Sequence, residues 1–436
     1  MKVLLHEIVR PRYPAVPDKE SSYLYGLRGV FVIESFLWVF LQTLVPGAVK
    51  GTANIYGPAY QIYLKKTLSV LFWNDNLIYS FFILVSARTI CLPFLKNPDK
   101  SGIAGSVFRR GLRLWFPVAV SLAVVKLMFW KMGTAYIDNY KSLTGNVSFD
   151  TPYYMPNTLV YFNSVFNMFW ITQNFATSAG SYAFPSQLLW VVNVIYMQSY
   201  TVYMAMLIIP YTRNSWRVKG SVLFIITAWW VQSWAWFTVT GLILADMVFN
   251  MNFKEKARRG IPIWRSRNIY FPSWILYSAL MAAGLIMQFI WTGWKPQDVD
   301  SEIIAHAGLY YTGGLNNKYD PAQPQARDDI YLILVAIFFA VETYDFLQRL
   351  LRNSVLVYLG SRSLSWLLVQ SIIIYTAGIK LFVHLNQEKH WPSEGSVFTV
   401  FIVCLAAVVP IAELFYRLVE YPSRALAYRL FDWIRE

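Results

Sequence analysis

Two ionisable residues lie in otherwise apolar stretches and are the first candidates for chemistry. Glu34 follows Arg28 by six residues, which places it about 9 Å further along a helix. Arg88 precedes Lys96 by eight residues in a second apolar stretch, at a similar depth. An ionisable residue inside a membrane span is costly unless it is matched. We therefore expect Glu34 and Arg88 to pair, either as catalytic groups or as a structural salt bridge.

Other charges in apolar stretches are weaker candidates. Asp75 lies at the entrance to an apolar stretch and is the third candidate catalytic residue. Helix capping or hydrogen bonding between helices is the simpler explanation for such residues. That explanation also covers four further acidic residues: Asp246, Glu342, Asp345 and Glu413.

The sequence lacks the signatures of common soluble enzymes. It contains no phosphate-binding glycine loop, no helix with paired metal-binding histidines and no nucleophile elbow. Its four histidines lie in the N-terminal tail or near expected outer loops. Cys91 and Cys404 both fall in apolar stretches. We therefore predict neither a metal site nor a disulfide.

The composition predicts an all-α integral membrane protein. Hydrophobic residues make up 56% of the chain and charged residues 14%, too little polar surface for a soluble body of 436 residues. Apolar stretches of the length that crosses a bilayer predict about ten transmembrane helices in one bundle. They cover approximately 29–46, 77–95, 112–131, 187–210, 220–233, 236–250, 272–293, 329–347, 363–384 and 396–418.

Basic residues gather at one end of the expected spans, which predicts that both termini are cytosolic. We expect a cytosolic segment 1–28, a membrane domain 29–418 and a cytosolic segment 419–436. The net charge of +14 then faces anionic lipid head groups and not nucleic acid. The expected partners are membrane lipid and a small lipophilic substrate, in the endoplasmic reticulum or another endomembrane.

The outer segment 132–186 carries two further patterns. Residues Leu159 to Ile171 are typical of an amphipathic helix or a re-entrant stretch. Asn146, Val147 and Ser148 form a glycosylation acceptor triplet, which predicts a glycan on Asn146.

Seven short strings occur in order from one end of the chain to the other. They are YLYGLRG (23–29), FFILVSA (81–87), FRRGLRL (108–114), QLLW (187–190) with Ser199, GLILAD (241–246), LGSRS (359–363) and AELF through VEYP (412–422). Together they resemble the acyltransferase-3 family of multispan membrane acyltransferases, in its fungal form.

The resemblance implies transfer of an acyl group from a coenzyme A thioester to a hydroxyl. Such a reaction needs cations for the phosphates of the acyl-CoA cosubstrate and a base for the acceptor. The implied donor-binding residues are Arg28, Arg109, Arg110 and Arg113. The implied substrate-binding residues are Trp190, Ser199 and Gln370, together with Tyr196, which lines the fourth span at helical spacing with Tyr200 and Tyr203.

Three polar positions of the family differ here. Val39 stands where the family's catalytic histidine is expected, Ile195 replaces an acidic residue, and Gln370 replaces a second histidine. Aromatic residues around 229–237 and on the fourth span form either a membrane-interface belt or the wall of a substrate cavity.

Three hypotheses remain open. The first is acyl transfer to a lipophilic hydroxyl in secondary-metabolite biosynthesis. The second is acid–base cyclisation or isomerisation of a terpenoid or polyketide on the same fold, without an acyl donor. The third is a non-catalytic membrane partner or transporter.

Overall fold

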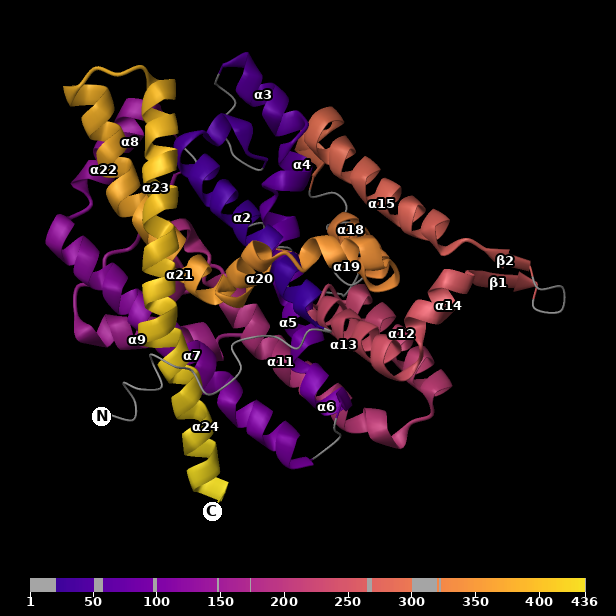
Figure 1. The fold of residues 1–436 in the computed structure, drawn as a ribbon. Helices are drawn as coiled ribbons and strands as arrows, with labels where there is room; N and C mark the ends of the chain where they lie inside the picture. Colours follow the sequence, from indigo (N-terminus) through magenta and orange to yellow (C-terminus); the bar gives the residue numbers. More distant parts are fainter. Residues whose placement is uncertain are drawn as a thin grey trace, which may run out of the picture. The chain divides into compact units, whose positions relative to one another are not determined.

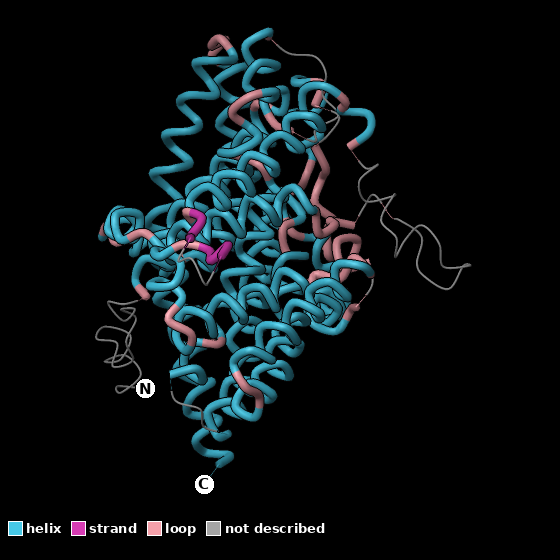
Figure 2. Tube along the Cα trace, turned by 90° about the vertical axis from the view of Figure 1, so that its right-hand side faces the viewer, coloured by secondary structure: helices cyan, strands magenta, loops and turns pink. Residues whose placement is uncertain are grey.

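Helices make up most of the described residues in the computed structural model (Figures 1 and 2). The structure describes residues 21–50, 58–96, 100–146, 149–172, 174–264, 269–299, 320 and 323–435. Within these residues the strands are β1 (Ile261–Trp264) and β2 (Ile269–Phe271), which pair antiparallel with Ile261 opposite Phe271. The predicted all-α fold class is confirmed.

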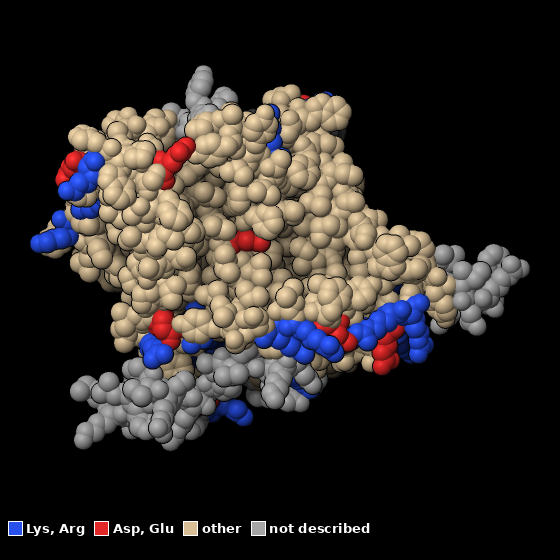
Figure 3. Space-filling model, turned by 45° about the horizontal axis from the view of Figure 1, so that its top comes forward, with Lys and Arg blue, Asp and Glu red and all other residues tan. Residues whose placement is uncertain are grey.

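The described residues contain the helices of a multi-pass membrane protein. Seven helical segments are long and apolar enough to cross a bilayer. They are Ser22–Leu44, Ser69–Lys96, Gly102–Met132, Pro185–Tyr211, Ser273–Trp294, Ser363–Glu388 and Ser393–Arg435. On the face drawn in Figure 3, uncharged side chains cover most of the described surface, as contact with lipid requires.

The structure does not reach the expected ten spans at two places. The expected fifth and sixth spans are the helices α12 (Asn214–Trp230) and α13 (Ala235–Asn250), of 17 and 16 residues. The expected eighth span consists of α18 (Asp328–Thr343) and α19 (Asp345–Leu351), which meet at an angle of 100°.

Side chains stabilise the bend between α18 and α19. Tyr344 is extended, so the last carbonyls of α18 lose their helical partners. Gln348 Nε2 donates to the Val341 carbonyl at 2.9 Å, and Arg258 Nε donates to the Thr343 carbonyl at 3.2 Å. The hydropathy of 329–347 predicts one straight helix because it contains no sign of these two hydrogen bonds, whose donors lie outside that range.

The chain divides into two compact units. Unit 1 consists of Met1–Asp75, Phe108–Asn193 and Val355–Glu436, and unit 2 of Asn76–Val107 and Val194–Ser354. Each unit therefore draws together segments that lie far apart in the sequence.

Unit 1 is built around two parallel helices. Its helices are α2 (Ser22–Leu44), α3 (Ala59–Lys66), α4 (Ser69–Phe72), most of α7 (Lys100–Met132), α8 (Ala135–Thr144), α9 (Thr158–Trp170), α10 (Ala179–Ala183), α20 (Ser354–Ser361), α21 (Ser363–Ile373), α22 (Ile379–Val383), α23 (Ser393–Phe415) and α24 (Tyr421–Arg435). Short 3₁₀ and π turns join several of them, including η1 (Pro46–Ala48), η2 (Pro185–Gln187), η7 (Ile374–Gly378), η8 (His384–Glu388) and η9 (Tyr416–Glu420).

Helices α2 and α21 lie side by side and point the same way. Gly360, just before α21, meets the Tyr25 carbonyl near the start of α2. Gln370 on α21 bonds Ser35 in the middle of α2. Small residues let helix backbones approach this closely, because a Cβ at Gly360 would overlap the Tyr25 carbonyl.

Helix α23 runs antiparallel to α21. Arg362, which precedes α21, pairs with Glu413 near the end of α23 at 2.9 Å. Gly378, beyond the end of α21, faces Cys404 in the middle of α23. The helix continues through η9 into α24 as far as Arg435, so residues 419–435 of the expected final segment are helical.

The outer segment contains α9, which confirms the helix predicted over 159–171. Leu159 and Trp170 on this helix are 69% and 73% exposed, while Val165 and Met168 are buried. One apolar face therefore packs inward and another remains uncovered, so the helix has no polar face opposite its apolar one.

Unit 2 is an assembly of shorter helices. They are α5 (Asp75–Ile90), α6 (Leu92–Lys96), most of α11 (Trp190–Ile208), α12, α13, α14 (Phe253–Arg259), α15 (Ser273–Phe289), α18 and α19. Helices α15 and α18 pack closely at Gly284, where an added Cβ would lie 2.7 Å from the Asp329 carbonyl.

Candidate functional site

Arginines from three helices of unit 1 converge. Arg28 on α2 lies within electrostatic range of Arg110 on α7 and Arg424 on α24. Arg113, one helical turn beyond Arg110, lies in range of the same two residues. Glu420 accepts a hydrogen bond from Arg424. We call Arg28, Arg110, Arg113 and Arg424 the arginine cluster.

The arginine cluster gathers four positively charged side chains. All four residues are half-buried. Among the described residues, Glu420 is the carboxylate that acts electrostatically on Arg28 and Arg113. Guanidinium groups bind phosphate oxygens through paired, charge-assisted hydrogen bonds. The cluster therefore has the chemistry of a site for a phosphate-bearing ligand.

Arg109, the fourth expected donor-binding residue, is directed elsewhere. Its guanidinium lies 4.2 Å from the centre of the Tyr428 ring and 5.5 Å from that of Phe431, both on α24. Adjacent residues on a helix point about 100° apart, so Arg109 and Arg110 reach different surroundings. The structure thus unites three of the four predicted arginines and adds Arg424.

Glu34 lies beside a buried polar contact further along α2. Gln370 is fully buried, and its Nε2 donates to Ser35 Oγ at 2.8 Å. Within the described part of the chain, neither Glu34 Oε2 nor Gln370 Oε1 has a hydrogen-bond partner, although both atoms are buried. Such unsatisfied atoms cost free energy, and native structures often keep them for a functional reason.

The same face of α2 carries the arginine cluster and this polar contact. Arg28 and Ser35 are seven residues apart, two helical turns or about 10 Å along one face. Val39, one turn further on, is fully buried and apolar. The position at which the family resemblance expects a histidine is therefore part of the core, and Glu34 is the acidic group nearest to it on α2.

Polar side chains continue from α21 to the outer segment. Ser371 Oγ and Ser186 Oγ are 2.6 Å apart. Ser186 and Gln187 both have positive φ, 62° and 54°, which is unusual for residues with a side chain. Gln187 Nε2 donates to Asp150 Oδ2 at 3.1 Å.

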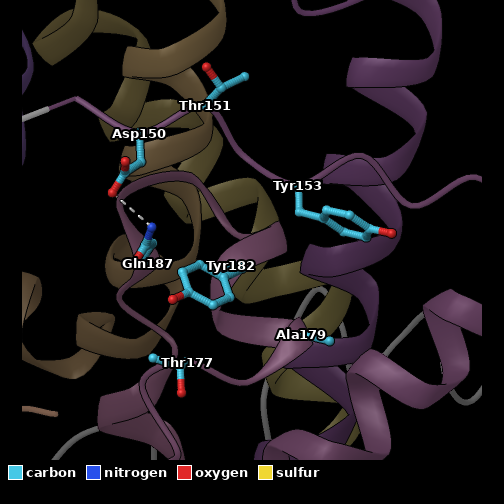
Figure 4. A pocket seen from close by; sticks show the side chains of 7 residues that line it. All are labelled: Asp150, Thr151, Tyr153, Thr177, Ala179, Tyr182 and Gln187. Atoms are coloured by element: carbon cyan, nitrogen blue, oxygen red, sulfur yellow. Dashed lines mark hydrogen bonds between the residues drawn. The ribbon is translucent and has the colours of Figure 1, made fainter. Parts of the chain in front are cut away.

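A cavity of about 630 Å³ lies at Asp150 and Gln187 (Figure 4). Tyr153 and Tyr182 line it together with three small residues, Thr151, Thr177 and Ala179. The hydrogen bond between Asp150 and Gln187 crosses one side of it in the close view. Unit 1 therefore has polar groups at its outer end, in its middle and at the arginine cluster.

The predicted pairing of Glu34 with Arg88 is wrong. Arg88 pairs with Glu342 on α18, with Nη2 and Oε1 3.0 Å apart, and each side chain is 1% exposed. Glu34 belongs to unit 1, whereas Arg88 and Glu342 both belong to unit 2. Depth along a helix was predicted from the sequence, but the identity of the neighbouring helix was not.

The expected substrate-binding residues belong to both units, and two of them bond within their own helix. Trp190 and Gln370 lie in unit 1, and Tyr196 and Ser199 lie in unit 2. Ser199 Oγ donates to the Ile195 carbonyl in its own helix at 2.6 Å. Tyr200 donates to Tyr196 at 2.7 Å between their hydroxyls. These two bonds act within α11.

The contacts of Asp75 and of the aromatic residues around 229–237 are explained by helix ends and packing. Asp75 is the first residue of α5, where a carboxylate is favourable at the helix N-terminus. Around the α12–α13 turn, Trp236 stacks on Tyr331 with 4.5 Å between ring centres. Trp229 donates to Asp328 at 2.7 Å. These contacts favour a packed aromatic cluster at this turn.

The surroundings of Asn146 oppose the expected glycan. Asn146 is 2% exposed, and its Nδ2 donates to the Thr43 carbonyl at 3.4 Å. A glycan would be attached to that nitrogen. Val147 and Ser148, the rest of the triplet, lie outside the described residues.

Sequence reasoning missed several residues of this site. Arg424 and Glu420 were missed because they lie in the segment 419–436, which was expected to be a cytosolic tail. Their spacing of four residues is nevertheless that of a helical ion pair. Nothing in the sequence signalled the contact between Ser186 and Ser371, since 185 residues separate them. Across the described residues, no group of three His, Cys, Asp or Glu side chains could hold a metal ion.

No protein-family model, curated protein or solved structure matches this chain.

Proposed function

We propose that the protein is a membrane-embedded acyltransferase that moves an acyl group from a coenzyme A thioester to a hydroxyl of a lipophilic acceptor. The observation that carries the proposal is the arginine cluster, which shares one face of α2 with the polar contact beside Glu34. The arginine cluster and Glu34 lie about 9 Å apart along α2 and about 120° apart around it, so a ligand with phosphates at one end and a thioester at the other would run obliquely across the helix.

The arginine cluster serves the donor in this proposal. Arg28, Arg110, Arg113 and Arg424 bind the phosphates of acyl-CoA and leave the thioester free to extend along α2. Glu420 limits the positive charge of the cluster and fixes Arg424 through their hydrogen bond. Arg109 contributes to the packing of α24 and not to the donor site.

Glu34 serves as the base. Its carboxylate accepts the proton of the acceptor hydroxyl as the hydroxyl oxygen attacks the thioester carbonyl. The carbon–sulfur bond then breaks, and the thiolate of coenzyme A leaves with a proton from Glu34. The products are an ester and free coenzyme A.

A specific observation favours a second function, acid–base cyclisation without an acyl donor. Phe36 and Phe40, which follow Glu34 on α2, pack against Phe401 with ring centres 5.9 and 5.1 Å away. Trp366 lies edge-on to Phe36 at 6.4 Å. Aromatic faces stabilise a carbocation, and a protonated Glu34 would supply the initiating proton.

Ten crossings with both termini in the cytosol remain part of the proposal. Helices α12 and α13 have 17 and 16 residues. At 1.5 Å per residue they measure roughly 25 Å. That is close to the roughly 27 Å hydrocarbon thickness of the endoplasmic reticulum membrane. The short pair therefore supports an endomembrane location.

The test is a thermal-shift measurement on the full-length protein in detergent. At about 100 times its dissociation constant, a ligand raises stability by roughly 2.7 kcal/mol, so coenzyme A should raise the Tm by a few degrees. Arg113→Gln should abolish most of that shift. Arg109→Gln is the matched control, because it removes an adjacent arginine from outside the cluster and should keep the shift.

The absence of a coenzyme A shift in the unmodified protein would reject acyl transfer. Conversion of a substrate without change in mass would then favour cyclisation. Uptake into vesicles without chemical change would favour the transporter hypothesis.

A further inference from the structure

A second cavity in unit 1, of about 670 Å³, lies where the outer ends of several helices meet. Its wall is formed by the end of α2, by η1 and α3, and by the start of α23. Phe40, Phe398 and Phe401 contribute aromatic rings, and Trp73 closes another side. This volume and lining are those of a site for a small organic molecule.

The polar groups that line this cavity indicate the charge of its ligand. Gln61 on α3, Asn386 in η8 and Glu394 in the first turn of α23 lie on its lining. Among the described lining residues there is no Lys, Arg or His. Lys65 and Lys66 also lie on α3 but are not part of the lining. A carboxylate with no cation beside it in the lining repels an anionic ligand. A neutral hydroxyl can donate a hydrogen bond to the carboxylate and exchange hydrogen bonds with the amide groups.

Helix α3 gives a lipophilic molecule access from the membrane. It has no buried residue, and Tyr60 and Tyr63 are 45% and 71% exposed. Tyrosine side chains of this kind lie at the boundary between lipid and water. A molecule that arrives from the lipid therefore meets the cavity at this interface.

One wall of the cavity packs against Tyr140 on α8. Phe382 lines the cavity and packs edge-on against Tyr140, with ring centres 5.5 Å apart. Tyr140 donates its hydroxyl to the Thr43 carbonyl at 2.5 Å, next to Leu44 in the cavity wall. Burial raises the pKa of Tyr140, so this hydroxyl stays protonated and remains a donor.

We infer that this cavity binds a neutral lipophilic alcohol and excludes the corresponding carboxylate. The inference goes beyond the proposed function and assigns the cavity no step of the acyl transfer, since Glu34 is not among its described lining residues. Phe398, Phe401 and Trp73 enclose the apolar body, and Gln61, Asn386 and Glu394 bind the hydroxyl.

Photolabelling with a matched pair of probes tests the inference. The probes are a diazirine-bearing long-chain alcohol and the carboxylic acid of the same chain, each irradiated with the full-length protein in detergent. The alcohol should label residues of the cavity wall about tenfold more than the acid. That ratio is expected if the cavity binds the alcohol about tenfold more tightly than the acid. Excess unlabelled alcohol should remove the signal.

Cavity-filling variants make the result specific. Val397→Trp places an indole in the cavity and should reduce labelling by about tenfold. Val403→Trp is the matched control, because it lies on the same helix, is 44% exposed and does not line the cavity. Leu143→Trp fills the cavity from α8 and replaces Val397→Trp if that variant fails to fold.

Equal labelling by the acid, labelling outside the cavity wall, or full labelling of both cavity-filling variants would overturn the inference. The measurement needs neither coenzyme A nor turnover. A coenzyme A shift without cavity labelling would therefore reject this cavity alone, and cavity labelling without a coenzyme A shift would reject acyl transfer alone.

Discussion

Arg88 and Glu342 form an ion pair of 3.0 Å in which each side chain is 1% exposed. The pair joins α5 to α18 within unit 2. Arg88 also lies 5.7 Å from the centre of the Phe249 ring. Because water is excluded from both charges, each depends on the other to offset its desolvation.

Arg88→Met should destabilise the protein strongly. Loss of one partner of a buried pair typically costs about 3–5 kcal/mol, because the other charge stays buried. The double variant Arg88→Met/Glu342→Met should recover most of the loss, since no unpaired charge remains. Thermal unfolding in detergent measures both. A double variant no more stable than Arg88→Met would contradict the cost assigned to the unpaired Glu342.

Glu34→Gln should abolish acyl transfer while leaving the fold nearly unchanged. The amide keeps the size of the carboxyl group but cannot accept the acceptor proton, and loss of a general base typically costs about 10²–10⁴ in rate. Release of free coenzyme A from acetyl-CoA, with the long-chain alcohol as acceptor, measures turnover. Unchanged turnover together with a lower Tm would assign Glu34 a purely structural role.

Gly360→Ala should weaken the packing of α2 against the start of α21. The added Cβ would meet the Tyr25 carbonyl, which is backbone and cannot rotate away. Overpacking of this kind typically costs about 1–3 kcal/mol. Gly220→Ala on α12 is the control, because nothing lies within 4 Å of its Cβ position. That helix should gain up to about 1 kcal/mol instead, and equal effects of the two substitutions would contradict the close approach.

Asn146 should carry no glycan in the folded protein. Its side chain is buried and bonded to Thr43, so a sugar on Nδ2 would have to displace the end of α2. Treatment with an N-glycosidase should leave the electrophoretic mobility of the protein unchanged, as should Asn146→Gln. A mobility shift that Asn146→Gln removes would contradict the burial of this side chain in the folded protein.

The sequence predicts the long helices well because hydropathy over about 20 residues is a strong signal. The expected 29–46, 112–131 and 363–384 lie within or overlap Ser22–Leu44, Gly102–Met132 and Ser363–Glu388. Hydropathy over 20 residues does not predict the break at Tyr344. The break depends on donors such as Arg258, which lies 85 residues away in the sequence.

The candidate site could be predicted only in part. Arg28, Arg110 and Arg113 do come together, because each lies near the end of an apolar helix where basic residues gather. Arg88 was assigned the wrong partner because hydropathy gives the depth of a residue but not the side of the helix that it faces. Arg109 differs from Arg110 for the same reason, since one step along a helix changes the neighbours completely.

The parallel direction of α2 and α21 fixes the parity of the membrane crossings. Two parallel spans cross in the same sense, so the chain between them must cross an odd number of times. In the described part of the chain, the segments of α5, α7, α11 and α15 are long and apolar enough for four crossings, so an odd number requires the bent pair α18–α19 to act as one span. The α12–α13 hairpin, with two crossings or none, leaves this parity unchanged. Because α23 returns antiparallel to α21, the start of α2 and the end of α23 lie at the same end of unit 1.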